Sequence, residues 1–160
     1  MPVLLARVDD RLIHGQVVHG WGAGLGATLY AIVSDTLRDD PDHAELYLLA
    51  VPDGARGRVL SVEECASDAV REELERERTI LLFADLETPL RLAGAGVPIP
   101  ALNVGGLHHA PGRVAVLPYV FLDAADRDRL HALAAGGVSI EARDLPGNRS
   151  YSLDDLVGAA

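Results

Sequence analysis

The chain has 160 residues, of which 49% are hydrophobic, and a formal net charge of −10 from 14 basic and 24 acidic residues. A chain of this length and composition is globular and fits one compact domain, so we expect a single domain over residues 1–160. The acidic balance argues against general nucleic-acid binding, which needs a basic face, and against docking onto anionic lipid.

No apolar run reaches membrane-spanning length and no signal-peptide pattern is present, so a soluble cytoplasmic protein is expected. All 14 basic residues are Arg. An internal anion site must therefore be built from Arg, backbone N–H groups or His. The single Cys65 cannot form an internal disulfide, and no metal-ligand spacing surrounds it. We expect it to be a buried, small apolar residue.

The first half of the chain begins with a strand over residues 3–8 and a helix over residues 15–21. The glycine-rich residues 22–27 have the spacing of a dinucleotide-binding turn. They precede a strand instead of a helix, so we interpret them as a flexible connection. Strands are expected over residues 28–33 and 58–60. Between them, Asp40-Pro41 is typical of a helix start, with an N-cap followed by proline at the first helical position.

In the second half, a capping-box pattern at Ser61 indicates a helix to about residue 77, before a strand over residues 79–83. A helix from Thr88-Pro89 to about residue 95 leads to strands over residues 101–104 and 113–117. Asp123 caps a further helix, which ends at the glycine pair 136–137. The last expected strand covers residues 138–143.

This alternation of strands and helices predicts an α/β protein. The expected architecture is a three-layer α/β/α sandwich with an open, mainly parallel, doubly wound sheet of about six to seven strands. Ligands in such sheets bind beyond the carboxyl ends of the strands. Residues 9–16, 34–35, 84–85 and 103–109 lie there, and function is expected where they converge. For Asp35 and Asp85 we slightly favour a role as helix or turn caps.

The first of these segments concentrates chemical groups. The sequence RVDDRLIHGQV, residues 7–17, holds two Arg, two Asp and one His between a strand and a helix. A neutral imidazole is a good nucleophile toward phosphorus, because its unperturbed pKa is about 6.5. The helix start beside His14 would add outward N–H groups and the positive end of the helix dipole, which favour phosphate.

Each neighbour of His14 has a plausible chemical role. Arg11 could bind phosphoryl oxygens bidentately, and Asp9 could hold the second ring nitrogen and fix the tautomer. Gly15 would let the backbone approach closely. The residues themselves leave a plainer alternative open, in which His14 makes only local hydrogen bonds and the Arg side chains pair with Asp9 and Asp10 on the surface.

The same stretch resembles the N-terminal signature of the mannose/fructose/sorbose-family IIB subunits of the bacterial sugar phosphotransferase system. The resemblance continues through Trp21, Val33-Ser34-Asp35, Thr88-Pro89 with Leu92 and Gly96-Val97, Asn103-Val104-Gly105-Gly106, Leu133 with Gly136-Gly137-Val138, and Arg143-Asp144-Leu145-Pro146. Three features depart from the family pattern: Leu107-His108-His109 in place of a frequent Met, the absence of Lys, and the tail at residues 147–160.

The resemblance implies one IIB phosphoryl-carrier domain with an open α/β/α fold. It also implies a phosphohistidine–sugar phosphotransferase, in which His14 matches the position that is phosphorylated. The phosphoryl group would come from a phosphohistidine on a IIA protein or domain. It would pass to a sugar held by the membrane components IIC and IID, which would keep the protein at the inner face of the membrane.

The resemblance also implies site residues. Arg11 and Asp9 match the positions that support the phosphohistidine, and we expect further phosphate-binding support from Asp10, Gly15, Gln16, Asn103, Gly105 and Gly106. Asn103, Gly105 and Gly106 fit a tight backbone turn, for which a purely structural role is about equally plausible. No cofactor is expected beyond the covalent phosphoryl group. No metal is expected, and no ATP-binding glycine loop is present.

Two alternatives remain open from the sequence. One is a regulatory phosphocarrier, which would keep His14 but signal to a protein partner instead of serving transport. The other is an unrelated nucleotide- or sugar-phosphate-binding domain, in which the first loop only holds an anion. His108 and His109 lie in a loop at the ligand-binding edge. The sequence does not say which of them, if either, lines the phosphoryl site.

Overall fold

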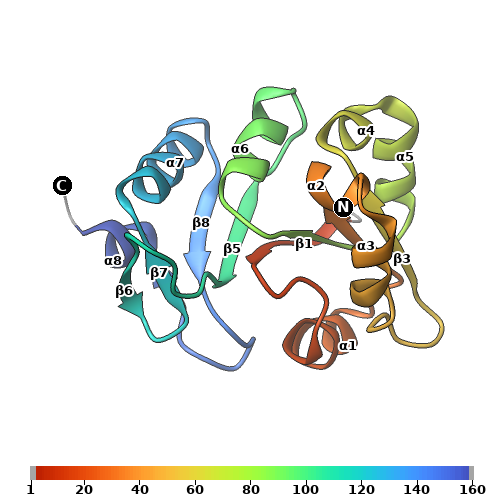
Figure 1. The fold of residues 1–160 in the computed structure, drawn as a ribbon, viewed down its shortest axis with the longest axis horizontal. Coiled ribbons are helices and arrows are strands. Elements are labelled where there is room, and N and C mark those ends of the chain that lie inside the picture. The colour runs from red at the N-terminus through yellow and green to blue at the C-terminus, as the bar shows by residue number, and fades with distance from the viewer. Residues whose placement is uncertain (1–2, 159–160) are drawn as a thin grey trace.

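In the computed structural model, which describes residues 3–158, seven strands form one sheet between two layers of helices (Figure 1). The strand order is β3-β2-β4-β1-β5-β8-β9, and β9 pairs antiparallel with β8 while the other pairs are parallel. This confirms the predicted α/β/α sandwich. The strands are β1 (Val3–Asp9), β2 (Leu29–Val33), β3 (Arg56–Leu60), β4 (Thr79–Phe83), β5 (Ala101–Gly106), β8 (Ser139–Ala142) and β9 (Tyr151–Ser152).

Each face of the sheet has its own apolar core. Ala31 and Val33 of β2 belong to one core, whereas Tyr30 and Ile32 of the same strand belong to the other. Because both faces are covered, the central strands β2 and β4 are continuous runs of buried, mostly apolar residues. Residues of α4 (Val62–Ala66), α5 (Asp68–Arg76), α6 (Glu87–Gly94), α7 (Ala124–Ala135) and α8 (Leu153–Val157) pack in the first core; η1 (Gln16–Gly22), α1 (Ala23–Leu25), α2 (Asp35–Arg38) and α3 (Pro41–Leu48) supply the second.

Several local predictions are confirmed. Asp40, Ser61 and Asp123 are helix N-caps, and each side chain accepts a hydrogen bond from the backbone N–H three residues later, at 3.3, 3.0 and 2.8 Å. Cys65 is fully buried in the first core. Burial raises the pKa of its thiol to about 11, so this side chain behaves as a small apolar group at neutral pH.

Two helical predictions need correction. The helix expected from Ser61 to about residue 77 is two helices, because Ser67 adopts an extended backbone and caps α5 through the N–H of Val70. Residues 22–27 are not simply a flexible connection. The helix continues through α1, and it ends at Gly26, whose φ of 66° is the left-handed conformation that favours glycine.

The run at residues 113–117 is a strand, but it lies outside the main sheet. It forms β6 (Val114–Leu117), which pairs antiparallel with β7 (Val120–Leu122) in a separate two-stranded sheet. The sequence did not predict α2, β7, β9 or α8. Each of these elements has two to five residues, which is too short for a periodic pattern to be recognised.

Candidate functional site

The candidate site lies at the carboxyl edge of the sheet, where β1 and β5 end side by side. Arg7 pairs with Asn103 in the ladder, but the register then shifts so that Asp9 pairs with Gly106. The backbone N–H of Asp10 donates to the carbonyl of Gly106 at 3.0 Å. Such irregularities re-aim side chains at strand ends. The predicted convergence of residues 9–16 with residues 103–109 is therefore confirmed.

The loop that follows β1 is held by a tight turn and by apolar anchors. The N–H of Leu12 donates to the carbonyl of Asp9 at 2.9 Å, and Leu12 has a φ of 56°. A non-glycine residue in this left-handed region costs about 1 kcal/mol or more, so the surroundings must hold it there. Leu12 and Ile13 are both buried in the second core. Their burial holds the turn and projects His14 from it.

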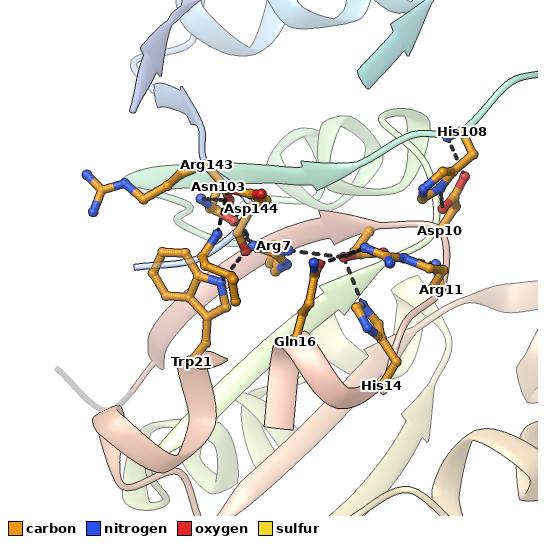
Figure 2. Close-up of polar contacts among 12 residues, drawn as sticks. Arg7, Asp10, Arg11, His14, Gln16, Trp21, Asn103, His108, Arg143 and Asp144 are labelled. Atoms are coloured by element: carbon orange, nitrogen blue, oxygen red, sulfur yellow. Dashed lines mark hydrogen bonds and ion pairs between the residues drawn. The ribbon is translucent and has the colours of Figure 1, made fainter. Parts of the chain in front are cut away.

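Asp9 is the centre of the site. Its carboxylate is fully buried and accepts hydrogen bonds from three side chains (Figure 2). Oδ2 lies 3.1 Å from Nη2 of Arg7 and 2.9 Å from Nε2 of His14. Oδ1 accepts from the backbone N–H and Nε of Arg11, at 3.1 and 3.2 Å. One carboxylate therefore organises two guanidinium groups and one imidazole.

These contacts determine the charge of Asp9. Burial disfavours the carboxylate, but the hydrogen bond with His14 and the charge of Arg7 outweigh burial and lower the pKa of Asp9 to about 2. Asp9 is therefore ionised at neutral pH, and an ionised carboxylate can only accept hydrogen bonds. Nε2 of His14 must then carry its hydrogen. In the neutral form of this ring the lone pair then lies on Nδ1.

The lowered pKa predicts how stability changes with acid. Asp9 stabilises the fold fully above its unfolded pKa of about 3.9, and this stabilisation is lost as the pH falls toward about 2. Between pH 5 and 2 the free energy of unfolding should fall by about 2 kcal/mol more in the wild type than in Asp9→Asn. Urea unfolding of both proteins across this range measures the difference. A constant difference between the two would contradict the role of the ionised Asp9.

Arg7 connects Asp9 to the opposite side of the sheet edge. Its side chain is fully buried. Nη1 donates to Oδ1 of Asn103 at 2.7 Å and to the carbonyl of Arg143 at 3.0 Å. Nη2 donates to the carbonyl of Asp144 at 3.1 Å as well as to Asp9. This charge is compensated by one carboxylate and three further oxygens, so Arg7 is a structural group that lies behind Asp9.

Two neighbours of Arg7 make its burial possible. A Cβ at Gly105 would lie 1.9 Å from Cζ of Arg7, so only glycine leaves room for the guanidinium. The ring of Trp21 lies 5.5 Å from the same carbon, and its Nε1 donates to the carbonyl of Asp144 at 2.8 Å. The sequence analysis did not include Arg7 or Trp21 in the site. An Arg within an apolar strand, on the same face as an Asp two residues later, was the available signal.

Arg11 and Gln16 lie at the open side of the site. Arg11 has a side chain that is 40% exposed, and its Nη2 donates to Oε1 of Gln16 at 2.8 Å. The space where a Cβ of Gly15 would lie is open to 4 Å. The solvent-facing side of His14 is therefore surrounded by a guanidinium, a primary amide and uncovered backbone. These groups can bind an anion by charge and hydrogen bonds.

The helix that follows His14 is a π-helix. The N–H of Ala23 donates to the carbonyl of Val18, five residues earlier, instead of four. This pattern brings residues five apart onto the same side, and π-turns often occur at functional sites. Figure 2 shows the result for Gln16 and Trp21, which both extend toward the Asp9 network, at Arg11 and Asp144 respectively. The helix predicted at residues 15–21 is present, but with this wider turn.

The remaining residues expected at the phosphate occupy other positions. Asn103 and Gly105 contact Arg7, so they lie behind Asp9. The tight turn expected at residues 103–106 is wrong, because these residues continue β5. Asp10 binds His108: its Oδ1 lies 2.6 Å from Nδ1, and its Oδ2 accepts from the backbone N–H at 2.7 Å.

Asp35 and Asp85 serve as caps, as the sequence favoured. Asp35 accepts from the N–H of Val62 at the start of α4, at 2.9 Å, and pairs with Arg91. Asp85 accepts from the N–H and hydroxyl of Thr88 at the start of α6, at 2.8 Å each. Neither contact involves His14, so the segments 34–35 and 84–85 do not contribute to the site.

Over residues 3–158, His, Cys, Asp and Glu side chains form no group of three or more that could hold a metal ion. Within the same residues, no helix has the length and apolar character needed to cross a bilayer.

Comparison with known proteins identifies a family, two relatives and a solved structure that resemble this chain. Residues 3–160 match the family described as the PTS system sorbose subfamily IIB component. The sorbose-specific EIIB component of Klebsiella pneumoniae is 31% identical over 157 residues, which are 98% of this chain and 96% of that protein. The mannose-specific EIIAB component of Escherichia coli K12 is also 31% identical, over 98% of this chain but 49% of that longer protein. Among solved structures, the IIBSor domain of the Klebsiella pneumoniae sorbose permease superposes with a TM-score of 0.90 at 31% identity, covering 100% of this chain and 99% of that one.

Proposed function

The chain belongs to the sorbose-subfamily IIB components of the bacterial sugar phosphotransferase system, and on that premise we propose that His14 carries the phosphoryl group in sugar uptake. The observation that supports this assignment best is the 2.9 Å contact between Nε2 of His14 and the ionised carboxylate of Asp9. This contact leaves Nδ1 as the nucleophile, because the carboxylate of Asp9 fixes the tautomer and the orientation of the ring through Nε2.

In the first step, Nδ1 of His14 attacks the phosphorus of a phosphohistidine on a IIA donor. The P–N bond to the donor breaks as the new P–N bond forms. Such transition states are loose, so positioning and charge matter more than covalent assistance. Asp9 accepts from Nε2–H throughout, and it stabilises the positive charge that develops on the His14 ring, as a carboxylate does for a catalytic His.

The phosphoryl group brings about −1.5 to −2 charges into a protein whose net charge is already −10. Arg11 supplies the nearest partly exposed positive charge, and it can turn from Asp9 and Gln16 toward the phosphoryl oxygens. The amide of Gln16 and the open backbone at Gly15 add neutral donors. A bidentate Arg–phosphate contact of this kind is strong and directional. No cofactor beyond the covalent phosphoryl group is needed.

In the second step, phospho-His14 passes its group to a sugar held by the membrane components IIC and IID. The partners are therefore a IIA donor and these membrane components, which would bring the chain to the inner face of the membrane. The match to half of a longer EIIAB protein supports a IIA donor, because that relative is named for both parts.

The direct test is phosphorylation of the purified chain by a phosphorylated IIA protein and the general phosphotransferase components. We expect an acid-labile, base-stable adduct on His14, and phosphorus–nitrogen coupling in an NMR spectrum should place it on Nδ1. Labelled ATP with magnesium should give no adduct in the absence of a donor. An adduct on Nε2, or direct labelling by ATP, would contradict the proposal.

A further inference from the structure

A second carboxylate–imidazole pair lies next to the first. Adjacent residues Asp9 and Asp10 each hold one imidazole, His14 and His108 respectively. Asp10 binds the Nδ1 of His108 and the backbone N–H of the same residue, at 2.6 and 2.7 Å. The bond to Nδ1 orients the ring, and the bond to the backbone N–H holds the residue in place beside Asp10. The side chain of His108 is 45% exposed, and within residues 3–158 no hydrogen bond to its Nε2 is found.

The two pairs share the same part of the surface. A Cβ at Gly106 would lie 3.1 Å from Oδ1 of Asp9 and 3.3 Å from Cε1 of His108. The glycine therefore lets the second ring approach the carboxylate that serves His14. In Figure 2, Arg11 lies between the Asp10–His108 pair and His14. His108 is thus at the edge of the site that an acceptor molecule must approach.

The two phosphoryl transfers of the proposed function, from IIA to His14 and from His14 to the sugar, differ in whether the attacking group must lose a proton. Transfer between imidazoles, from the donor to His14, requires no proton removal from an attacking hydroxyl. Transfer to a sugar does, because the hydroxyl must lose its proton as its oxygen bonds to phosphorus. Asp9 cannot readily take this proton, since its carboxylate is buried and has a pKa of about 2. A nitrogen held at the edge of the site suits this task.

We propose that His108 is the proton acceptor for the sugar hydroxyl. In this step, which rests on the proposed function, the P–Nδ1 bond of phospho-His14 breaks and its electron pair returns to Nδ1. A P–O bond forms to the sugar, and the hydroxyl proton moves to Nε2 of His108. Asp10 accepts from Nδ1–H and stabilises the imidazolium that results, as in an Asp–His pair of a hydrolase.

The test compares two acceptors for the same phosphoprotein. In one reaction, phospho-His14 transfers its group back to unphosphorylated IIA, which is an imidazole acceptor. In the other, it transfers the group to sugar in inverted membrane vesicles from the cell that makes this chain, which supply the membrane components. The vesicles receive a mixture of mannose, fructose, sorbose and N-acetylgalactosamine. His108→Asn keeps a hydrogen-bond donor for Asp10 but has no Nε2. We expect kcat for sugar phosphate formation to fall about a hundredfold, which is the lower end of general-base effects because the transition state is loose.

Discharge to IIA should be unchanged in His108→Asn. His109→Ala is the matched control, because this neighbouring ring packs edge-on against Phe121, 5.9 Å between centroids, and should not affect either reaction. Equal slowing of both discharges would indicate a structural role and overturn the inference. So would an increase in KM for sugar at unchanged kcat, or wild-type rates. A wild type that is never labelled on His14 would instead overturn the proposed function.

Discussion

Replacing His14 by alanine should abolish phosphorylation of the chain by a phosphorylated IIA protein. Nδ1 of His14 is the nitrogen that attacks phosphorus in the proposed mechanism, and nothing at the site can replace it. Asp9 keeps its contacts with Arg7 and Arg11 in this variant, so its charge stays compensated. Transfer of a radioactive phosphoryl group from labelled IIA protein, followed by separation of the proteins under basic conditions, measures the loss. Circular dichroism should show that the His14→Ala protein is folded.

The matched control is His19→Ala. His19 is an exposed imidazole on η1, five residues after His14, and should be dispensable. The His19→Ala protein should accept the phosphoryl group at the wild-type rate. Full labelling of folded His14→Ala protein would remove His14 from the reaction and would require another acceptor on the chain.

The second large effect is expected for Arg7→Met, and it is an effect on stability. Removing one partner of a buried ion pair leaves the other charge uncompensated, which typically costs about 3–5 kcal/mol. Asp9 would lose a guanidinium contact at 3.1 Å, and three oxygens, from Asn103, Arg143 and Asp144, would each lose one hydrogen-bond donor. Urea unfolding at neutral pH should show a fall of that size in the free energy of unfolding.

Arg11→Ala should behave in the opposite way. Its side chain is 40% exposed, so folding should hardly change. Phosphotransfer should slow about ten- to a thousandfold, because a charge-assisted contact to the phosphoryl group is lost. The rate of phosphotransfer is measured by stopping the reaction at several times, and the free energy of unfolding is measured for both variants. Wild-type stability in Arg7→Met would contradict the structural role, and wild-type transfer in Arg11→Ala would remove Arg11 from the site.

The residues that we propose to react could be recognised in the sequence because they are close together in the chain. Asp9, Arg11 and His14 lie within six residues, and one tight turn brings them together. The central strands β2 and β4 were predictable because coverage on both faces makes each of them a continuous apolar run.

What the sequence did not reveal depends on distant contacts. Arg7 bonds to residues 96, 136 and 137 positions away, so its place behind Asp9 becomes visible only in the folded chain. The Asp10–His108 contact spans 98 positions. For the same reason the run at residues 113–117 was placed in the wrong sheet. The apolar run predicted a strand in the covered sheet, but Val114 of β6 is exposed, and the partner and direction of β6 depend on the short strand β7, which has no periodic signal.

The wide turn of η1 makes the length of this segment important for function. A π-turn is an α-helix that accommodates one additional residue, and its hydrogen-bond geometry is rarely favoured on its own. Deleting a single residue between Gln16 and Trp21 would allow an ordinary α-helix, which should be locally more stable. The two side chains would then be four residues apart, a spacing that also places them on one side of an α-helix, so the contacts with Arg11 and Asp144 would both remain possible. With the length unchanged, an ordinary α-helix would instead turn the two side chains to different sides. The length of the segment and the width of its turn are therefore matched, and a change in one requires a change in the other.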